Sequence, residues 1–147
     1  ILVIGRGAAR DGLAALAKQL GIAERTRFTG FITDAERNRL LLASRVCVCP
    51  SEKEGWGLTV IEANATGTPV VASDAPGLRD SVRHGQTGFL AQPRSVEAFA
   101  DRIGELLSDD ALATRMSRES LAWSKRFHWD TAASELAAAL EDARSGA

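Results

Sequence analysis

The residues best suited to chemistry lie between positions 50 and 72. Two carboxylates, Glu54 and Glu62, stand on either side of a Gly-Trp-Gly turn. Gly55 and Gly57 permit a sharp turn and let a ligand approach the backbone closely. A helix that begins directly after this turn leaves its first amides free, which favours the binding of a phosphate group. The alternative is a plain strand–loop–helix joint with flexible glycines, and the glycines alone do not decide between the two.

Glu62 adds a second indication of a ligand. It follows the run Leu58–Ile61 and precedes Ala63, so we expect it to be buried on most sides. A buried carboxylate is costly unless it accepts hydrogen bonds. A sugar diol is one suitable donor, and a nearby backbone amide or lysine is the other. The residue type and its setting leave both alternatives open.

Short apolar runs that alternate with helical patterns must position these carboxylates. The predicted strands are Ile1–Ile4, Arg27–Thr29, Val46–Cys49 and Val70–Ala72. The run at 46–49 is continuously apolar and ends at Pro50, which implies a parallel strand covered on both faces. The turn at 55–57 would then lie at the carboxyl end of a parallel strand, where ligands of open α/β sheets bind.

Helical spacing of apolar residues accounts for the connections. The pattern predicts helices over about 13–20, 33–44 and 58–66, and from Ser95 onward only helical patterns remain, the last of them over 132–140. Thr33 and Glu36 form a capping box, in which Thr33 satisfies a free amide and Glu36 reaches back. Strands and helices in alternation predict an α/β fold, a Rossmann-like parallel sheet with helices on both faces and a helical C-terminal segment.

Composition excludes several classes of protein. The 147 residues carry a formal net charge of −1, so electrostatic binding to nucleic acid or to an anionic membrane is not expected. No run reaches the length of about 18 apolar residues needed for a membrane span. The two cysteines, Cys47 and Cys49, would point to the same face of a strand, where they do not pair readily, and a metal site needs more ligands. A reducing, cytoplasmic location fits best.

Taken together, the motifs resemble those of a known enzyme family. The central motif is Glu-x7-Glu at 54–62, within Pro-Ser-x-x-Glu-Gly-Trp-Gly-Leu and followed by Gly-Thr-Pro-Val-Val-Ala at 67–72. Further matches are Ile-Gly-Arg-Gly at 4–7, Phe-Thr-Gly-Phe at 28–31, His-Gly-Gln-Thr-Gly-Phe-Leu at 84–90 and Phe-His-Trp at 127–129. Over about residues 1–140 the chain resembles the donor-binding, C-terminal domain of the retaining glycosyltransferases of family GT4, which have the GT-B fold.

The resemblance implies a role for each matched residue. Glu62 would accept hydrogen bonds from the ribose hydroxyls of a nucleotide sugar, and Glu54, the catalytic candidate, would lie beside the transferred sugar. The substrate-binding segment would comprise Gly55, Trp56, Gly57, Leu58 and Thr59, whose amides hold sugar and diphosphate. Gly30 and Phe31 would border the base. The implied reaction transfers a sugar from a nucleoside diphosphate to an acceptor with retention of configuration and without a bound metal or other cofactor.

The same resemblance implies partners for the chain. Residues 1–147 would form a partial nucleotide-sugar-binding domain, because the family's first strand of this domain, its basic diphosphate clamp and its N-terminal acceptor domain would all precede Ile1. Peripheral membrane contact would come only through that acceptor domain. The chain by itself is expected to be inactive.

Other functions are compatible with parts of the pattern. A GT-B nucleotide-sugar epimerase would bind the same donors, and a non-catalytic nucleotide-sugar-binding module would hold a donor without transferring it. A dinucleotide dehydrogenase fits least, because Gly5-Arg6-Gly7 lacks the third glycine of that fingerprint.

Overall fold

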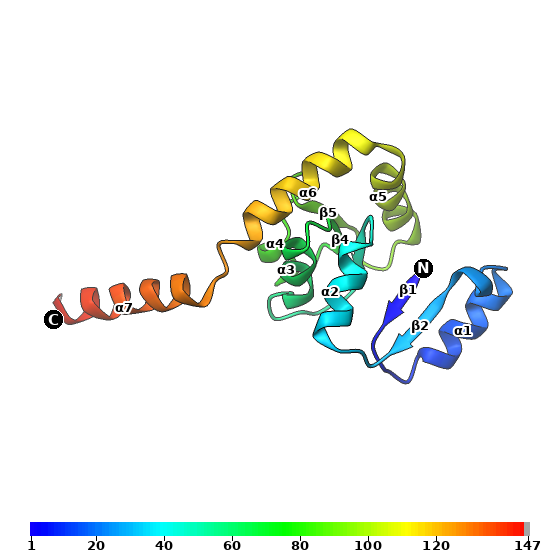
Figure 1. Ribbon diagram of the computed structural model, residues 1–147, viewed down its shortest axis with the longest axis horizontal. Coiled ribbons are helices and arrows are strands. Elements are labelled where there is room, and N and C mark those ends of the chain that lie inside the picture. Colours follow the sequence, from blue (N-terminus) through cyan, green and yellow to red (C-terminus); the bar gives the residue numbers. More distant parts are fainter. Residues whose placement is uncertain (146–147) are drawn as a thin grey trace. The chain divides into compact units, whose positions relative to one another are not determined.

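The structure is a computed structural model that describes residues 1–145, and it divides into two compact units, Ile1–Leu40 and Leu41–Ala147. Every strand pair in it is parallel. The predicted α/β class, with parallel strands flanked by helices and a helical C-terminal segment, is confirmed (Figure 1).

The first unit is a strand–helix–strand arrangement. Its elements are β1 (Leu2–Ile4), α1 (Arg10–Gln19), the 3-10 turn η1 (Ala23–Arg25), β2 (Arg27–Gly30) and the start of α2 (Asp34–Leu42). β1 pairs with β2, and α1 connects them. Of the apolar positions predicted for the buried stripe of α1, Ala17 is buried, whereas Leu13, Leu16 and Leu20 are exposed.

The start of α2 confirms one half of the predicted capping box and corrects the other. The hydroxyl of Thr33 accepts a hydrogen bond from the Glu36 amide at 3.2 Å. The Glu36 carboxylate accepts two bonds from the guanidinium of Arg39, at 2.8 and 2.7 Å, rather than reaching back to the cap. A charged donor one turn along the helix makes a stronger bond than a neutral amide, which explains the difference.

The second unit contains the larger sheet. Its elements are β3 (Cys47–Cys49), α3 (Leu58–Ala65), β4 (Val70–Ser73), α4 (Leu78–Ser81), β5 (Gly88–Ala91), α5 (Val96–Ser108), α6 (Asp110–Ser124) and α7 (Trp129–Ser145). The strands pair in the order β3-β4-β5 without an irregularity in register.

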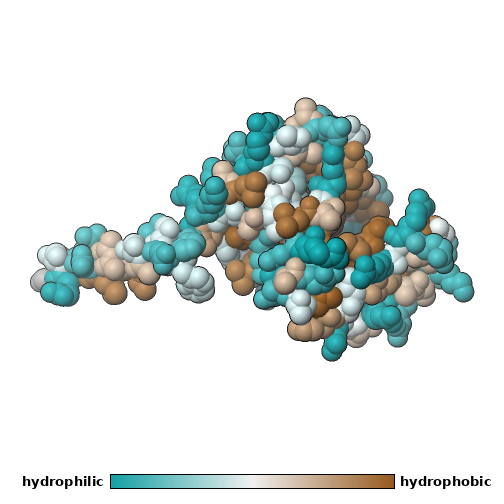
Figure 2. All heavy atoms as spheres, viewed as in Figure 1, coloured by the Kyte–Doolittle hydropathy of each residue, from teal (hydrophilic) through white to brown (hydrophobic). Residues whose placement is uncertain are grey.

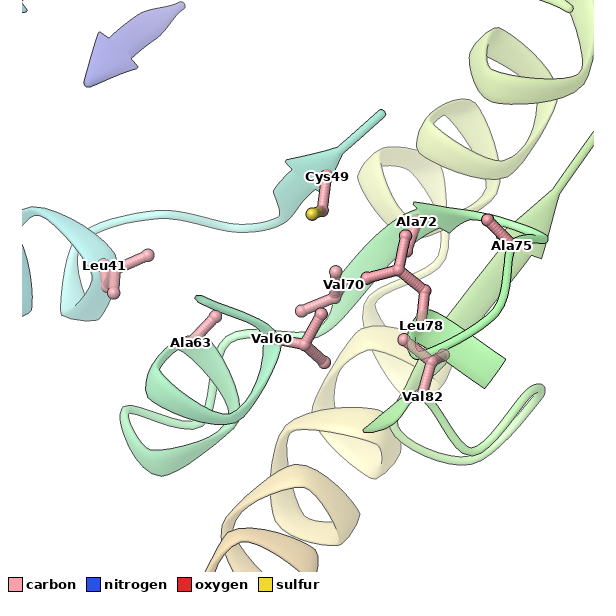
Figure 3. Close-up of a cluster of buried hydrophobic side chains, with 9 residues drawn as sticks. All are labelled: Leu41, Cys49, Val60, Ala63, Val70, Ala72, Ala75, Leu78 and Val82. Carbon is pink, nitrogen blue, oxygen red and sulfur yellow. The ribbon is translucent and has the colours of Figure 1, made fainter. Parts of the chain in front are cut away.

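The central strand β4 separates two apolar clusters. Val70 and Ala72 point toward α3 and α4, where they pack with Val60 and Leu78 (Figure 3). Val71 points to the opposite face and belongs to the cluster formed with α5 and α6. All four residues of β4 are buried, which is the arrangement expected of a parallel strand with helices on both faces.

Two strand predictions differ from the structure. Val48 on β3 remains 42% exposed, so the expected cover on both faces of that strand is incomplete, and β3 is an edge strand of its sheet. The strand β5 was not predicted, because its run is short and begins with glycine. That glycine is required, since a Cβ atom at Gly88 would lie 1.9 Å from the carbonyl oxygen of Val70 on β4.

The C-terminal helix α7 presents apolar side chains at its surface. Every residue from 129 to 145 is exposed, including Trp129 at 88% and Leu136 at 63% (Figure 2, at the left of the view). Within residues 1–145, no helix combines the length and the hydropathy that crossing a membrane requires.

Candidate functional site

Three loops meet at the carboxyl edge of the larger sheet. They follow β3, β4 and β5 and occupy residues 50–57, 74–77 and 92–95. Because the three strands are parallel and in register, these loops lie at the same edge. The loop after β3 contains Glu54 and the Gly-Trp-Gly turn, so the structure places the predicted motif where ligands of such sheets bind.

Gly57 turns the chain into α3. It has left-handed backbone angles, with φ 82° and ψ 55°, and stands at the N-cap of the helix. A Cβ atom there would also lie 2.8 Å from the Ser81 hydroxyl oxygen and 2.9 Å from a methyl carbon of Leu78. Glycine is therefore required both by the backbone conformation and by the close packing of α4.

Trp56 is anchored by an aromatic cluster. Its ring meets that of Phe127 edge-on, with centroids 4.7 Å apart, and Phe127 meets Trp123 in the same way at 4.9 Å. The indole nitrogen of Trp123 donates to the carbonyl oxygen of Ser81 at 2.9 Å. This aromatic cluster (Trp56, Phe127 and Trp123) ties the loop after β3 to α4 and to the end of α6.

The other predicted donor-site residues of this unit surround the turn. Glu54 and Glu62 are half-buried, whereas Gly55, Leu58 and Thr59 are exposed. Leu58 is 69% exposed although Val60, Ile61 and Ala63 of the same helix are buried, so the first turn of α3 lies at an open surface. The Val60 amide donates to the Gly57 carbonyl oxygen at 2.9 Å. The first amides of a helix have no acceptor within it, which leaves those of Leu58 and Thr59 available to an anion.

Gly30 and Phe31, the predicted base-binding pair, lie in the first unit. Gly30 ends β2 with φ 67°, and its carbonyl oxygen accepts from the Gly5 amide at 3.1 Å. Phe31 is 74% exposed, and the guanidinium of Arg6 stands 5.6 Å from its ring centroid. An exposed aromatic ring with a cation above it forms a flat surface of the kind on which bases stack.

The loop after β3 is also tied to the loop after β5. The Arg94 guanidinium donates to both oxygens of Glu52, at 2.6 and 2.5 Å. This bond lowers the pKa of the Glu52 carboxyl below its usual value. Beside the pair lies a cavity of about 430 Å³, lined mainly by apolar residues of β3 and α5. None of the predicted site residues lines it.

Sequence reasoning missed three features of this edge: the Glu52–Arg94 pair, the contact of Phe127 with Trp56, and the contact of Gly77 with the backbone of Glu54. Of these, only Gly77 carried a local signal, because Pro76-Gly77 is a turn dipeptide after a strand.

The two histidines have different surroundings. His84 has a structural role, since its Nδ1 accepts from the Leu90 amide at 3.0 Å. The side chain of His128 is 68% exposed, and its Nδ1 accepts from the Asp130 amide at 3.3 Å. Among residues 1–145, no group of three or more His, Cys, Asp or Glu side chains is arranged to hold a metal ion.

The sequence matches a known protein family. Residues 1–123 match the model of the family described as glycosyl transferases group 1. The chain is 43% identical over 145 residues to D-inositol 3-phosphate glycosyltransferase of Streptomyces griseus, covering 95% of this chain and 31% of that protein. It therefore spans about a third of the length of this relative.

Solved structures extend the match to the fold. Sucrose-phosphate synthase from Thermosynechococcus elongatus superposes with a TM-score of 0.87 at 30% identity, over 99% of this chain and 39% of that one. The Anabaena protein HepE in complex with UDP superposes with a TM-score of 0.86 at 28% identity, over 96% of this chain and 40% of that one. HepE has also been solved in complex with UDP-glucose.

Proposed function

Because the chain belongs to the glycosyl transferases group 1 family, we propose that it is the donor-binding part of a retaining glycosyltransferase of the GT4 type with the GT-B fold. In the proposed reaction, the bond between the anomeric carbon and the diphosphate breaks, and the anomeric carbon forms a bond to an acceptor hydroxyl oxygen. The nucleoside diphosphate leaves and takes up the proton of the acceptor hydroxyl, and the configuration of the sugar is retained.

The observation that carries this proposal is the turn from β3 into α3. Gly57, in its left-handed conformation, starts a helix whose exposed first turn lies at the carboxyl edge of a parallel sheet. Negative charge grows on the leaving diphosphate as the sugar departs. Amide donors and the positive end of a helix dipole stabilise such charge. The same turn lies between the two carboxylates of the motif.

The two carboxylates have separate roles in the proposal. Glu62 lies within α3, one turn beyond the helix start, and accepts from the ribose hydroxyls. Glu54 precedes the turn and meets the transferred sugar. Gly55, Trp56, Gly57, Leu58 and Thr59 hold the sugar and the diphosphate.

Gly30 and Phe31 border the base. The acceptor is bound by a separate N-terminal domain, which also makes any peripheral membrane contact, and the reaction uses no bound metal. The same proposal places the protein in the cytoplasm, where the free thiols of Cys47 and Cys49 stay reduced.

A panel of UDP, GDP and ADP sugars, titrated into the full-length protein with thermal unfolding as the readout, tests the donor role. A ligand that binds the folded state raises its melting temperature by mass action. We expect one nucleotide class to raise the melt strongly and the Glu62→Gln variant to lose most of that response. No response to any of these donors would contradict the proposal. A strong response with no sugar transfer to any acceptor would indicate a binding module instead.

A further inference from the structure

The loop that contains Glu54 rests directly on Gly77, in the turn between β4 and α4. A Cβ atom added at Gly77 would lie 2.4 Å from the carbonyl oxygen of Glu54 and 2.8 Å from the carbonyl carbon and oxygen of Gly55. These are backbone atoms, so rotation of a side chain cannot relieve the collision. Gly77 also has φ 78°, which other residues rarely adopt. Any larger residue at this position must displace the backbone of one loop or the other.

The turn beneath Glu54 is firmly fixed. Ala75 and Leu78, on either side of Gly77, are 3% and 0% exposed and lie in the apolar cluster around Ala72 (Figure 3). Just before them, the Asp74 amide donates to the carbonyl oxygen of Ala91 on β5 at 2.8 Å. Displacing the turn at 74–77 would disturb this core. A collision at Gly77 should therefore displace the loop at 50–57 instead.

An ion pair closes the same turn on its outer side. The guanidinium of Arg79 donates to the Asp74 carboxylate at 2.5 Å and to the Asp74 carbonyl oxygen at 3.1 Å. The first of these bonds lowers the pKa of Asp74, so the ion pair persists further into the acidic range than it would with an unshifted carboxyl group. Arg79 therefore holds the start of the turn to the start of α4.

We infer that Gly77 is a positioning residue: the turn between β4 and α4 is the support that sets the place of the Glu54 backbone, and glycine is required there for steric reasons. This inference rests on the proposed role of Glu54 beside the transferred sugar. Gly77 acts through Glu54 and touches no substrate itself. A displacement of about 1 Å at a reacting centre lowers turnover by about 100-fold, so a support of this kind controls rate more than binding.

Gly77→Ala in the full-length protein tests this inference, with Gly85→Ala as the matched control. Gly85 has nearly the same backbone angle, φ 76°, but no heavy atom lies within 4 Å of a Cβ atom placed there. Both variants carry the cost of a positive φ, and Gly77→Ala adds the collision together with a ψ of −43°, which lies outside the left-handed helical region. We expect Gly77→Ala to lower turnover by about 10- to 100-fold and Gly85→Ala to stay close to the native protein. The affinity of Gly77→Ala for the bare nucleoside diphosphate should fall less than its turnover, because the collision displaces the Gly55 carbonyl as well as the Glu54 backbone. Equal turnover in the two variants would overturn the inference.

A double-mutant cycle with Glu54→Ala separates positioning from general damage. If Gly77 acts through Glu54, adding Gly77→Ala to Glu54→Ala lowers turnover little further, because the group being positioned is already gone. If the turnover losses of the two single variants multiplied in the double variant, Gly77→Ala would be damaging the site in general. A loss of nucleoside diphosphate affinity as large as the loss of turnover would mean the same. Either result would overturn the inference.

Turnover of an Arg79→Gln variant and amide hydrogen exchange test the inference where Gly77→Ala does not fold or the protein transfers no sugar. If Gly77→Ala does not fold, Arg79→Gln loosens the same turn without a collision, and unchanged turnover in that variant would overturn the inference. If the native protein binds and transfers no sugar, the proposed function fails, and amide hydrogen exchange decides the role of Gly77 independently. We expect faster exchange at residues 54–57 in Gly77→Ala than in Gly85→Ala. Equal exchange would contradict the support role.

Discussion

The ring of Trp56 contacts that of Phe127 edge-on, at 4.7 Å between centroids and 69° between planes. The two residues lie far apart in the sequence, one in the loop after β3 and the other between α6 and α7. Phe127 also contacts Trp123, whose indole nitrogen donates to the Ser81 carbonyl oxygen. A Cβ atom at Gly57 would collide with the hydroxyl of that same Ser81. The aromatic cluster and the glycine turn therefore both pack against Ser81 on α4.

Phe127→Ala should therefore loosen the loop that contains Trp56. Two edge-on aromatic contacts are lost, at about 0.5–1.5 kcal/mol each beyond the area they bury. We expect a lower melting temperature and a red shift of tryptophan emission as Trp56 becomes more hydrated. Phe127→Tyr is the control, because it keeps the ring. Native melting and emission in Phe127→Ala would show that the contact does not anchor the loop.

Glu62→Gln should weaken nucleotide binding in the full-length protein. The variant keeps the shape of the side chain but removes the charge, and hydrogen bonds to charged groups contribute about 1.5–3 kcal/mol each. Titration with the nucleoside diphosphate measures the loss. Glu119→Gln, an exposed change on α6, serves as the control and should bind as the native protein does. Unchanged affinity in a folded Glu62→Gln variant would remove this residue from the site.

Glu54→Ala should separate turnover from binding. Glu54 lies before the turn and Glu62 within the helix, so the first should meet the sugar and the second the ribose. We expect the bare nucleoside diphosphate to bind nearly as before, while turnover falls by about tenfold or more, as when a contact made in the transition state is lost. If both glutamate variants damaged nucleotide affinity to the same extent, this division of roles would be wrong.

Local patterns predicted the strands and helices around the motif well. The run at 70–72 lies within β4 and is fully buried, and the helix predicted over about 58–66 is α3, Leu58–Ala65. These predictions hold because an apolar run bounded by glycine and proline has few other solutions. The strand β5 is not predicted because its first residue is Gly88. Glycine is required there for the close approach to Val70, but it weakens the strand pattern in the sequence.

The supports of the site could not be predicted in the same way. Phe127 and Gly77 reach the loop after β3 through tertiary contacts, and no periodicity within either segment indicates which loop it will meet. The segment between α6 and α7 shows the same limit. Phe127 contacts Trp56, whereas the neighbouring His128 and Trp129 are exposed, and nothing in the local sequence distinguishes the three positions.

Cys47 should react slowly with alkylating reagents in the folded protein. Burial, with a smaller effect of Cys49, raises the pKa of its thiol from 9.0 to about 11. The thiolate is the reactive form, so at pH 8 the folded protein holds about 100-fold less of it than an unfolded chain. Between about pH 9 and 11 the unfolded thiol ionises while the folded one stays protonated, so stability should fall as pH rises.

Iodoacetamide labelling of a Cys49→Ser variant measures this directly, because Cys47 is then the one cysteine of the 147-residue chain. Labelling is compared with and without urea at pH 8. Equal rates in the two conditions would show that the thiol of Cys47 is not protected by the fold.

The 147-residue chain alone should fold but transfer no sugar. β4 is fully buried between two apolar clusters, which is enough core for a cooperative unit. Transfer, however, needs the proposed acceptor domain, both to supply the acceptor and to exclude water around the developing charge.

The helix α7 should be the weakest element of the isolated chain. Leu136 and Leu140 are 63% and 62% exposed, and an unpartnered apolar face frays or pairs with another copy. The test is to purify the chain, record a cooperative melt and assay it with the donor that the full-length protein uses. Robust transfer by this chain alone would contradict the proposal that it is the donor-binding part of a larger enzyme.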